Sequence, residues 1–258
     1  SGNLKTTGVI SLVRSMLRVN PEMKATIFQH DMDSGLLINT FIGQMGYRRR
    51  DILDNLMSKE EQIDIIRKDE ITNRMNFHCI DRDTNIGTLE GIHKMVIREQ
   101  PDIWVIDYLG AVVNNEEVEK KNKDQVNDQF KRAMQGFKLL AQRTQSIGII
   151  VHQAKLKVSE FRRDPRPTLG EVEYSSDSIF ASNYVYMSYF PVGSHVAFSK
   201  ENEAISKRLY YQIWMKSRTS ENTFTILEFD PPTGKISDPS PEVLRLGYHH
   251  WELLGGNK

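Results

Sequence analysis

Apolar residues along this chain recur with two different spacings, and the two kinds of segment alternate. Residues 9–18, 33–46 and 124–146 carry apolar side chains at positions that share one face of a helix. Residues 102–109 and 147–153 are almost continuously apolar, which is typical of strands covered on both faces. This alternation predicts an α/β domain in which helices cover a parallel sheet.

Shorter segments continue the same order. Residues 24–30 and 75–82 are predicted to be strands, 88–100 a helix, and 48–68 a charged helical excursion. From residue 184 onward the sequence is rich in aromatic and β-branched residues separated by turn signals. This part predicts mixed or antiparallel strands that finish the sheet.

Composition narrows the class of protein. The 258 residues are 39% hydrophobic, enough for the core of one large domain or two modest ones. Basic and acidic residues number 34 each, so an anionic partner would have to be bound by a local patch. The single cysteine, Cys79, excludes an internal disulfide and has apolar neighbours that predict burial. No apolar run reaches the length of about 20 residues that crosses a bilayer, so we expect a cytoplasmic protein without a membrane segment.

The first residues resemble the end of a phosphate-binding loop. Such a loop reads G-x-x-x-x-G-K-[ST], in which backbone N–H groups surround phosphates, the lysine neutralises them and the hydroxyl holds Mg²⁺. Leu4 stands where the second glycine is expected, and the first glycine and the strand before the loop would fall ahead of residue 1. The candidate nucleotide contacts are Gly2, Asn3, Leu4, Lys5, Thr6 and Thr7.

Polar residues end three of the predicted strands, and ligands of open parallel sheets collect at the carboxyl ends of strands. Asp107 ends the first long apolar strand, where its carboxylate could support Mg²⁺ beside Thr6. An isolated aspartate in such a place is more often a turn cap, but the Lys5-Thr6 pair favours the magnesium hypothesis. The other two strand ends carry Gln29-His30-Asp31 and His152-Gln153.

Several segments, taken in order, resemble the motor domain of the DnaB-type replicative DNA helicases of bacteria and phages. They read "DIWVIDYLGAVV", "IGIIVHQAKLK", "RPTLGEVEYSSDSIFASNYVYMSY" and "YYQIWMKSRTSENTFTILEFDPPTGKI". The resemblance implies a RecA-like P-loop NTPase core over residues 1–236 and a C-terminal extension over 237–258. It places the family's N-terminal collar domain outside these residues.

The same resemblance implies an activity. We expect an ATP- and Mg²⁺-dependent motor that moves along single-stranded DNA as a hexameric ring and unwinds duplex DNA. A primase and a helicase loader are the implied partners, and the cytoplasm of a bacterial cell or phage-infected host is the implied location. Two alternatives stay open, namely a recombinase-like ATPase that forms filaments on DNA and a degenerate ring ATPase that binds nucleotide for regulation.

The resemblance also assigns roles to nucleotide-contacting residues. It implies that Lys5 contacts the β- and γ-phosphates, that Thr6 and Asp107 hold Mg²⁺, and that Gln153 senses the γ-phosphate. Lys216 and Arg218 match a pair that reaches across a subunit boundary to the neighbour's nucleotide. Where the family has a catalytic glutamate, this sequence has Asp31, whose side chain is shorter by one methylene.

Two segments are candidates for DNA contact, because both leave the end of the sheet that would face the channel of a ring. Residues 114–125 follow the aspartate strand, and 155–167 follow the glutamine strand. Their charges would contact phosphates without reading sequence, although charge runs are usually solvated loops. The predicted contacts are Lys120, Lys121, Lys123, Lys155, Lys157, Arg162, Arg163 and Arg166, and the resemblance adds Glu173, Tyr174, Ser175 and Ser176.

Overall fold

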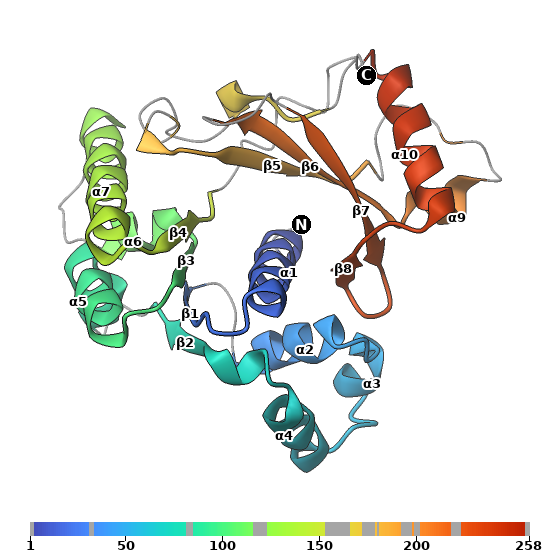
Figure 1. The fold of residues 1–258 in the computed structure, drawn as a ribbon, viewed down its shortest axis with the longest axis horizontal. Helices are drawn as coiled ribbons and strands as arrows, with labels where there is room; N and C mark the ends of the chain where they lie inside the picture. The colour runs from blue at the N-terminus through green and yellow to red at the C-terminus, as the bar shows by residue number, and fades with distance from the viewer. Residues whose placement is uncertain are drawn as a thin grey trace.

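A computed structural model of the chain contains two sheets with helices packed around them (Figure 1). All structural statements below refer to the residues that it describes. These are 3–30, 34–80, 85–115, 123–152, 166–171, 179, 181–191, 198, 202–217 and 223–255.

The first sheet is parallel and has the strand order β2-β1-β3-β4. Every residue of the two central strands is buried, which explains why their sequences are almost wholly apolar. In register, Gln29 lies opposite Asp107 on one neighbour and Cys79 on the other, so the carboxyl ends of these strands coincide. The strands are β1 (Ala25–Gln29), β2 (Met75–Cys79), β3 (Ile103–Asp107) and β4 (Ile147–Ile150).

Helices cover both faces of this sheet, as the alternation of segments predicted (Figure 1). Alternate residues of a strand point to opposite faces. On one face Ile27 and Val105 pack in the same apolar cluster as α1 and α2, and on the other Phe28 and Ile106 pack with α5, α6 and α7. The helices are α1 (Asn3–Val19), α2 (Ser34–Gln44), α5 (Leu89–Glu99), α6 (Leu109–Asn115) and α7 (Lys123–Thr144).

The charged excursion forms two short helices, α3 (Arg49–Leu53) and α4 (Lys59–Lys68). A capping box between Ser58 and Glu61 begins α4, because each side chain accepts from the other residue's backbone N–H. The buried guanidinium of Arg14 in α1 pairs with Asp69 just after α4 at 2.8 Å. This ion pair attaches the excursion to the helix that carries the candidate phosphate loop. The 3₁₀ turns are η1 (Thr72–Arg74), η2 (Asn85–Gly87) and η4 (Leu169–Glu171).

The late strands form a second sheet, which is antiparallel and has the order β5-β6-β7-β8. The prediction that they finish the first sheet was therefore wrong, although the prediction of antiparallel strands is confirmed. Consecutive strands joined by turns pair with one another and need no crossover helix. The strands are β5 (Val185–Tyr189), β6 (Leu209–Lys216), β7 (Phe224–Asp230) and β8 (Lys235–Ser237).

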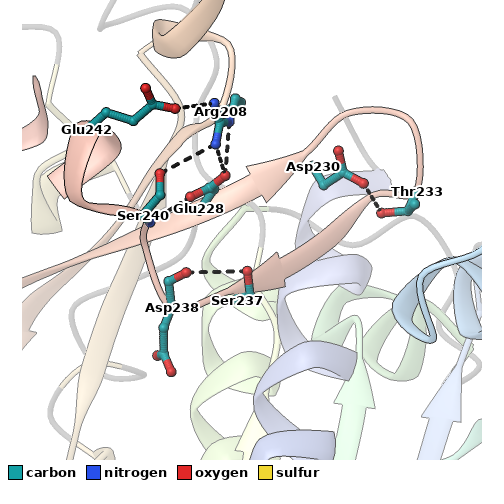
Figure 2. Close-up of polar contacts among 8 residues, drawn as sticks. All are labelled: Arg208, Glu228, Asp230, Thr233, Ser237, Asp238, Ser240 and Glu242. Carbon is teal, nitrogen blue, oxygen red and sulfur yellow. Dashed lines mark hydrogen bonds and ion pairs between the residues drawn. The ribbon is translucent and has the colours of Figure 1, made fainter.

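Two helices accompany this sheet, α9 (Glu203–Ser206) and α10 (Pro241–Leu253). The Tyr211 hydroxyl in β6 donates to the Gly247 carbonyl of α10 at 2.8 Å, so the predicted extension docks in its helical part. A polar cluster fixes where β6, β7 and α10 begin or end, because the Arg208 guanidinium contacts Glu228, Glu242 and Ser240 (Figure 2).

Two sequence-based expectations meet the fold in different ways. Cys79 is exposed, so the prediction that it is buried was wrong. It ends β2, which lies at the edge of its sheet and has only one neighbouring strand. Among the described helices, none combines the length and the apolar character that crossing a bilayer would require.

Candidate functional site

The structure brings Thr6 and Asp107 into direct contact. The Thr6 hydroxyl donates a hydrogen bond to Oδ2 of Asp107 at 2.5 Å, and the two side chains are buried at 6% and 7% exposure. Thr6 lies in the first turns of α1, and Asp107 is the last residue of the central strand β3. Two residues that the sequence predicted for one metal site therefore share one location.

The donor set of this pair fits Mg²⁺. Hydroxyl and carboxylate oxygens are ligands that this ion accepts, and Mg²⁺ in nucleotide sites keeps several waters and takes substrate phosphates as further ligands. Within the described part of the chain, no group of three or more His, Cys, Asp or Glu residues could hold a metal ion by itself. The pair would thus supply part of a coordination shell that phosphate and water complete.

Lys5 stands one residue before Thr6 in the first turn of α1 and is half-buried. The first backbone N–H groups of a helix lack intrahelical partners and carry positive partial charge, which favours phosphate there. Asn3 and Leu4 begin this helix, and Gly2 lies outside the described residues. Lys5 and the start of α1 therefore place positive charge beside the Thr6–Asp107 pair.

The carboxyl ends of the central strands meet beside the same pair. The backbone N–H of His30 donates to the Asp107 carbonyl at 2.9 Å, and Nδ1 of His30 lies 2.8 Å from the Ile80 carbonyl. The peptide bond between Asp107 and Tyr108 is cis. His152 follows β4, with its ring stacked on Phe130 at 5.5 Å between centroids. Asp31 and Gln153, the predicted catalytic residues, follow His30 and His152 and lie outside the described residues.

The second sheet supplies two tyrosines that the sequence analysis did not connect with the site. Burial, followed by the neighbouring Tyr210 and the Asp107 carboxylate, raises the pKa of Tyr186, so this phenol stays protonated. The Tyr210 hydroxyl donates to Oγ of Ser188 at 2.5 Å and also lies against Gly8 of α1. Their aromatic character predicted strand packing, but no local signal indicated that this packing reaches the phosphate loop.

A further residue missed by sequence reasoning is Arg49. Its Nη2 donates to the Thr7 hydroxyl at 3.1 Å, and Thr7 is fully buried. Thr7 directly follows the Thr6 that contacts Asp107. Arginine runs are usually solvated, and nothing within the run itself distinguishes Arg49 from its neighbours.

Of the predicted pair on the late strands, Lys216 is described and Arg218 lies outside the described residues. Lys216 ends β6, and its Nζ donates to the Ile179 carbonyl at 2.6 Å. Ile179 ends the "GEVEYSSDSI" segment, so the strand end and that predicted DNA-contacting segment are joined within one chain.

Most predicted DNA contacts are not described, and Arg166 is the main exception. Its guanidinium lies 4.5 Å from the centre of the Trp251 ring, and its Nη2 donates to the Leu254 carbonyl at 3.0 Å. Arg166 is therefore engaged by α10, and its contact with DNA stays a prediction. Lys123 begins α7, whereas Lys120, Lys121, Lys155, Lys157, Arg162, Arg163, Glu173, Tyr174, Ser175 and Ser176 lie outside the described residues.

No protein-family model and no curated protein matches the sequence. Two solved structures match the fold, each with a TM-score of 0.70 and 16% sequence identity over 92% of this chain. One is a DnaB-like replicative helicase described with its interactions with primase, and the other is the ATPase domain of a second helicase.

The chain has the RecA-like fold of these helicase ATPase domains. The resemblance read from the sequence motifs is thus confirmed at the level of the fold. The chain spans 55% of the DnaB-like helicase chain and 81% of the second helicase's ATPase domain.

Proposed function

We propose that this chain is the ATP-driven motor domain of a replicative DNA helicase. In this proposal it works as a hexameric ring that moves along single-stranded DNA and unwinds the duplex ahead. The observation that carries the proposal is the buried contact between Thr6 and Asp107 on a fold shared with helicase ATPase domains. A hydroxyl from the phosphate-loop helix and a carboxylate from a central strand end are the two protein groups that a Mg²⁺–nucleotide site needs.

The binding step follows from the chemistry of the described residues. Lys5 and the backbone N–H groups at the start of α1 would bind the triphosphate. Thr6 and Asp107 would hold Mg²⁺, which when bound neutralises β- and γ-phosphate oxygens. Asp107 keeps its carboxylate in a buried place, where its charge acts over a shorter and less screened distance than in water.

Hydrolysis requires residues beyond this pocket. Asp31 would orient the attacking water, with Asp33 as the other nearby acid, and Gln153 would sense the γ-phosphate. Lys216 and Arg218 would reach the nucleotide of the adjacent subunit, and a guanidinium in that place stabilises transition-state charge. A subunit alone would then turn over ATP poorly, which favours a closed ring.

DNA contact would come from the basic segments around residues 114–125 and 155–167 and from residues 173–176. The ammonium and guanidinium groups would bind phosphates, so binding should be independent of sequence and weaker at higher salt. A primase or a helicase loader is the proposed protein partner, and one structural neighbour is described in its interactions with primase. The bacterial or phage-infected cytoplasm is the proposed location.

The experiment that tests this function is unwinding of a forked DNA duplex with ATP and Mg²⁺. The protein should separate the strands, Lys5→Ala should abolish separation, and Arg50→Met should keep it, because the Arg50 side chain is 86% exposed. Binding of single-stranded DNA without any unwinding, together with helical filaments in electron micrographs, would support the recombinase-like alternative. Nucleotide binding without DNA binding at low salt would support the regulatory alternative.

A mixing experiment tests the shared pocket. Lys5→Ala and Arg218→Ala subunits should each be inactive alone, but some mixed interfaces would pair an intact phosphate loop with an intact arginine. ATP turnover should therefore reappear on mixing. Failure to recover turnover at every mixing ratio would show that Arg218 does not act across subunits.

The role of Asp31 can be separated from nucleotide binding. Asp31→Asn should lower ATP turnover while leaving the affinity for the Mg²⁺–ATP complex nearly unchanged, because the amide keeps the shape but no longer orients water as a base. A loss of affinity with turnover preserved at saturating ATP would remove Asp31 from this role.

A further inference from the structure

Three consecutive arginines begin α3, and only the middle one points into the molecule. The Arg50 side chain is 86% exposed and pairs with Asp54, one helical turn away, at 3.0 Å. Arg48 is exposed as well. Arg49 instead reaches the phosphate-loop helix, where its Nη2 donates to the Thr7 hydroxyl at 3.1 Å.

The Arg49 side chain lies in a slot between two glycines. A β-carbon on Gly234 would lie 2.2 Å from both Cζ and Nη2 of Arg49, and one on Gly43 would lie 3.2 Å from its Nε. Real Cβ atoms do not approach neighbours at 2.2 Å, so an alanine at 234 would displace the guanidinium. The slot therefore admits a planar cation only because residue 234 has no side chain.

The backbone around the slot is fixed by further hydrogen bonds. The Arg49 backbone N–H donates to the Pro232 carbonyl at 3.0 Å, and Nε2 of Gln44 donates to the Gly234 carbonyl at 2.8 Å. The Thr233 hydroxyl donates to Oδ2 of Asp230 at 2.5 Å, which stiffens the turn between β7 and β8 (Figure 2). Arg49 is thus held between this turn and α1 before any ligand binds.

The charge of Arg49 is not balanced by any described residue. No carboxylate in the described part of the chain pairs with it, and its buried Nε has no hydrogen-bond partner there. Burial lowers the pKa of Arg49, which reflects the cost of removing this cation from water. A buried cation without an anion is costly, and such sites are usually completed by a bound negative group.

The missing anion can be located from the geometry of α1. Side chains on a helix lean toward its N-terminus, so the Thr7 hydroxyl faces the start of α1, where Lys5 and the free N–H groups also lie. We propose that Arg49 is a second phosphate-binding cation of the nucleotide site, which neutralises the bound triphosphate beside Thr7 while Lys5 acts on its other side. This inference rests on the proposed nucleotide site but requires neither hexamer formation nor DNA.

The test is the affinity of the full chain for two probes, a slowly hydrolysed Mg²⁺–ATP analogue and inorganic tripolyphosphate, measured by calorimetry. Arg49→Met should weaken both by about tenfold or more, because a charge-assisted hydrogen bond is worth about twice a neutral one. Tripolyphosphate lacks base and ribose, so an equal loss for both probes assigns the contact to phosphate. Arg49→Lys should recover part of the affinity, and Arg50→Met should match the wild type within about twofold, the spread expected for an exposed site.

Thermal unfolding without ligand separates phosphate binding from a purely structural role. Removing an unbalanced buried charge should leave the melting temperature unchanged or raise it. A folded Arg49→Met protein that binds both probes within about twofold of the wild type, the level of the Arg50→Met control, would overturn the inference. Failure of Arg49→Met to fold would also overturn it, because the cation would then be required by the unliganded fold. If Lys5→Ala also leaves affinity unchanged, the nucleotide site itself fails, which distinguishes the two outcomes.

Discussion

The hydroxyl of Tyr210, in the second sheet, lies so close to Gly8 of the phosphate-loop helix that a β-carbon on Gly8 would be 2.8 Å from it. This distance is below any that real Cβ atoms show. Tyr210 is fully buried, and its hydroxyl is held by Ser188. The antiparallel sheet thus sets the position of the helix that carries Lys5 and Thr6.

Gly8→Ala should therefore destabilise the protein by about 1–3 kcal/mol, the usual cost of adding a methyl group to a packed interior, less the helix propensity that alanine gains. Tyr210→Phe should rescue Gly8→Ala when compared with Tyr210→Phe alone. Urea unfolding measures both effects. Gly170→Ala is the control, because a β-carbon there meets nothing within 4 Å. Equal stability of Gly8→Ala and wild type would show that the contact is looser than described.

Replacement of either member of the Thr6–Asp107 pair should change the Mg²⁺ requirement. Asp107→Asn keeps the shape but loses the charge, and Thr6→Val loses the hydroxyl, so each should raise by about tenfold or more the Mg²⁺ concentration that half-saturates ATP turnover. The double variant should be no worse than the poorer single variant, because the two residues act as one unit. Asp102→Asn, at the opposite end of β3, should leave the Mg²⁺ requirement unchanged. Additive losses in the double variant would contradict a shared ion.

His250 should make the protein less stable in mildly acidic solution. Burial, assisted by Arg166 and His249, lowers the pKa of His250 to about 4. Unfolded histidine has a pKa near 6.5, so between pH 6.5 and about 4 the unfolded chain binds the proton and the folded chain does not. Stability should fall by up to about 3 kcal/mol as the pH drops through this window. His250→Gln should flatten this dependence, and exposed His249→Gln should not; an unchanged slope in His250→Gln would contradict the assignment.

The cluster around Arg208 should contribute stability at neutral pH that acid removes (Figure 2). Burial alone would raise the pKa of Glu228, but the Ser240 backbone N–H and the Arg208 guanidinium together hold it below its ordinary value. A lowered carboxylate pKa gives stability that is complete above the unfolded value and is lost as the pH falls through the folded one. Glu228→Gln should cost about 1–3 kcal/mol at pH 7 in urea unfolding. Glu242→Gln, whose side chain is 49% exposed, should cost less than about 1 kcal/mol, and the reverse order would show that Glu242 anchors Arg208.

The elements were predictable because their signal is local. The run of apolar residues at 103–107 identifies a central strand, and the helical spacing at 9–18 identifies α1, without knowledge of any partner. The pairing of Thr6 with Asp107 was also predictable, since the carboxyl end of a parallel strand and the helix that follows a phosphate loop meet at one edge of the sheet.

Features that depend on packing between distant segments were not predictable. Nothing near Arg49 in the sequence shows that Gly234 leaves room for its guanidinium, and nothing near Tyr186 shows that it approaches Asp107. Cys79 was mispredicted because apolar neighbours indicate a strand but not whether that strand lies at an edge. The departure at Asp31 stays a matter for experiment, because a carboxylate one methylene shorter changes reach and not charge.

Steady-state hydrolysis of Mg²⁺–ATP by the assembled protein, with and without single-stranded DNA, is the sharpest check of the proposed motor when wild type and Lys5→Ala are compared. We predict turnover that single-stranded DNA stimulates and that the Lys5→Ala change abolishes. Turnover that Lys5→Ala leaves intact, or an assembled wild type that hydrolyses no ATP on DNA, would contradict the proposal.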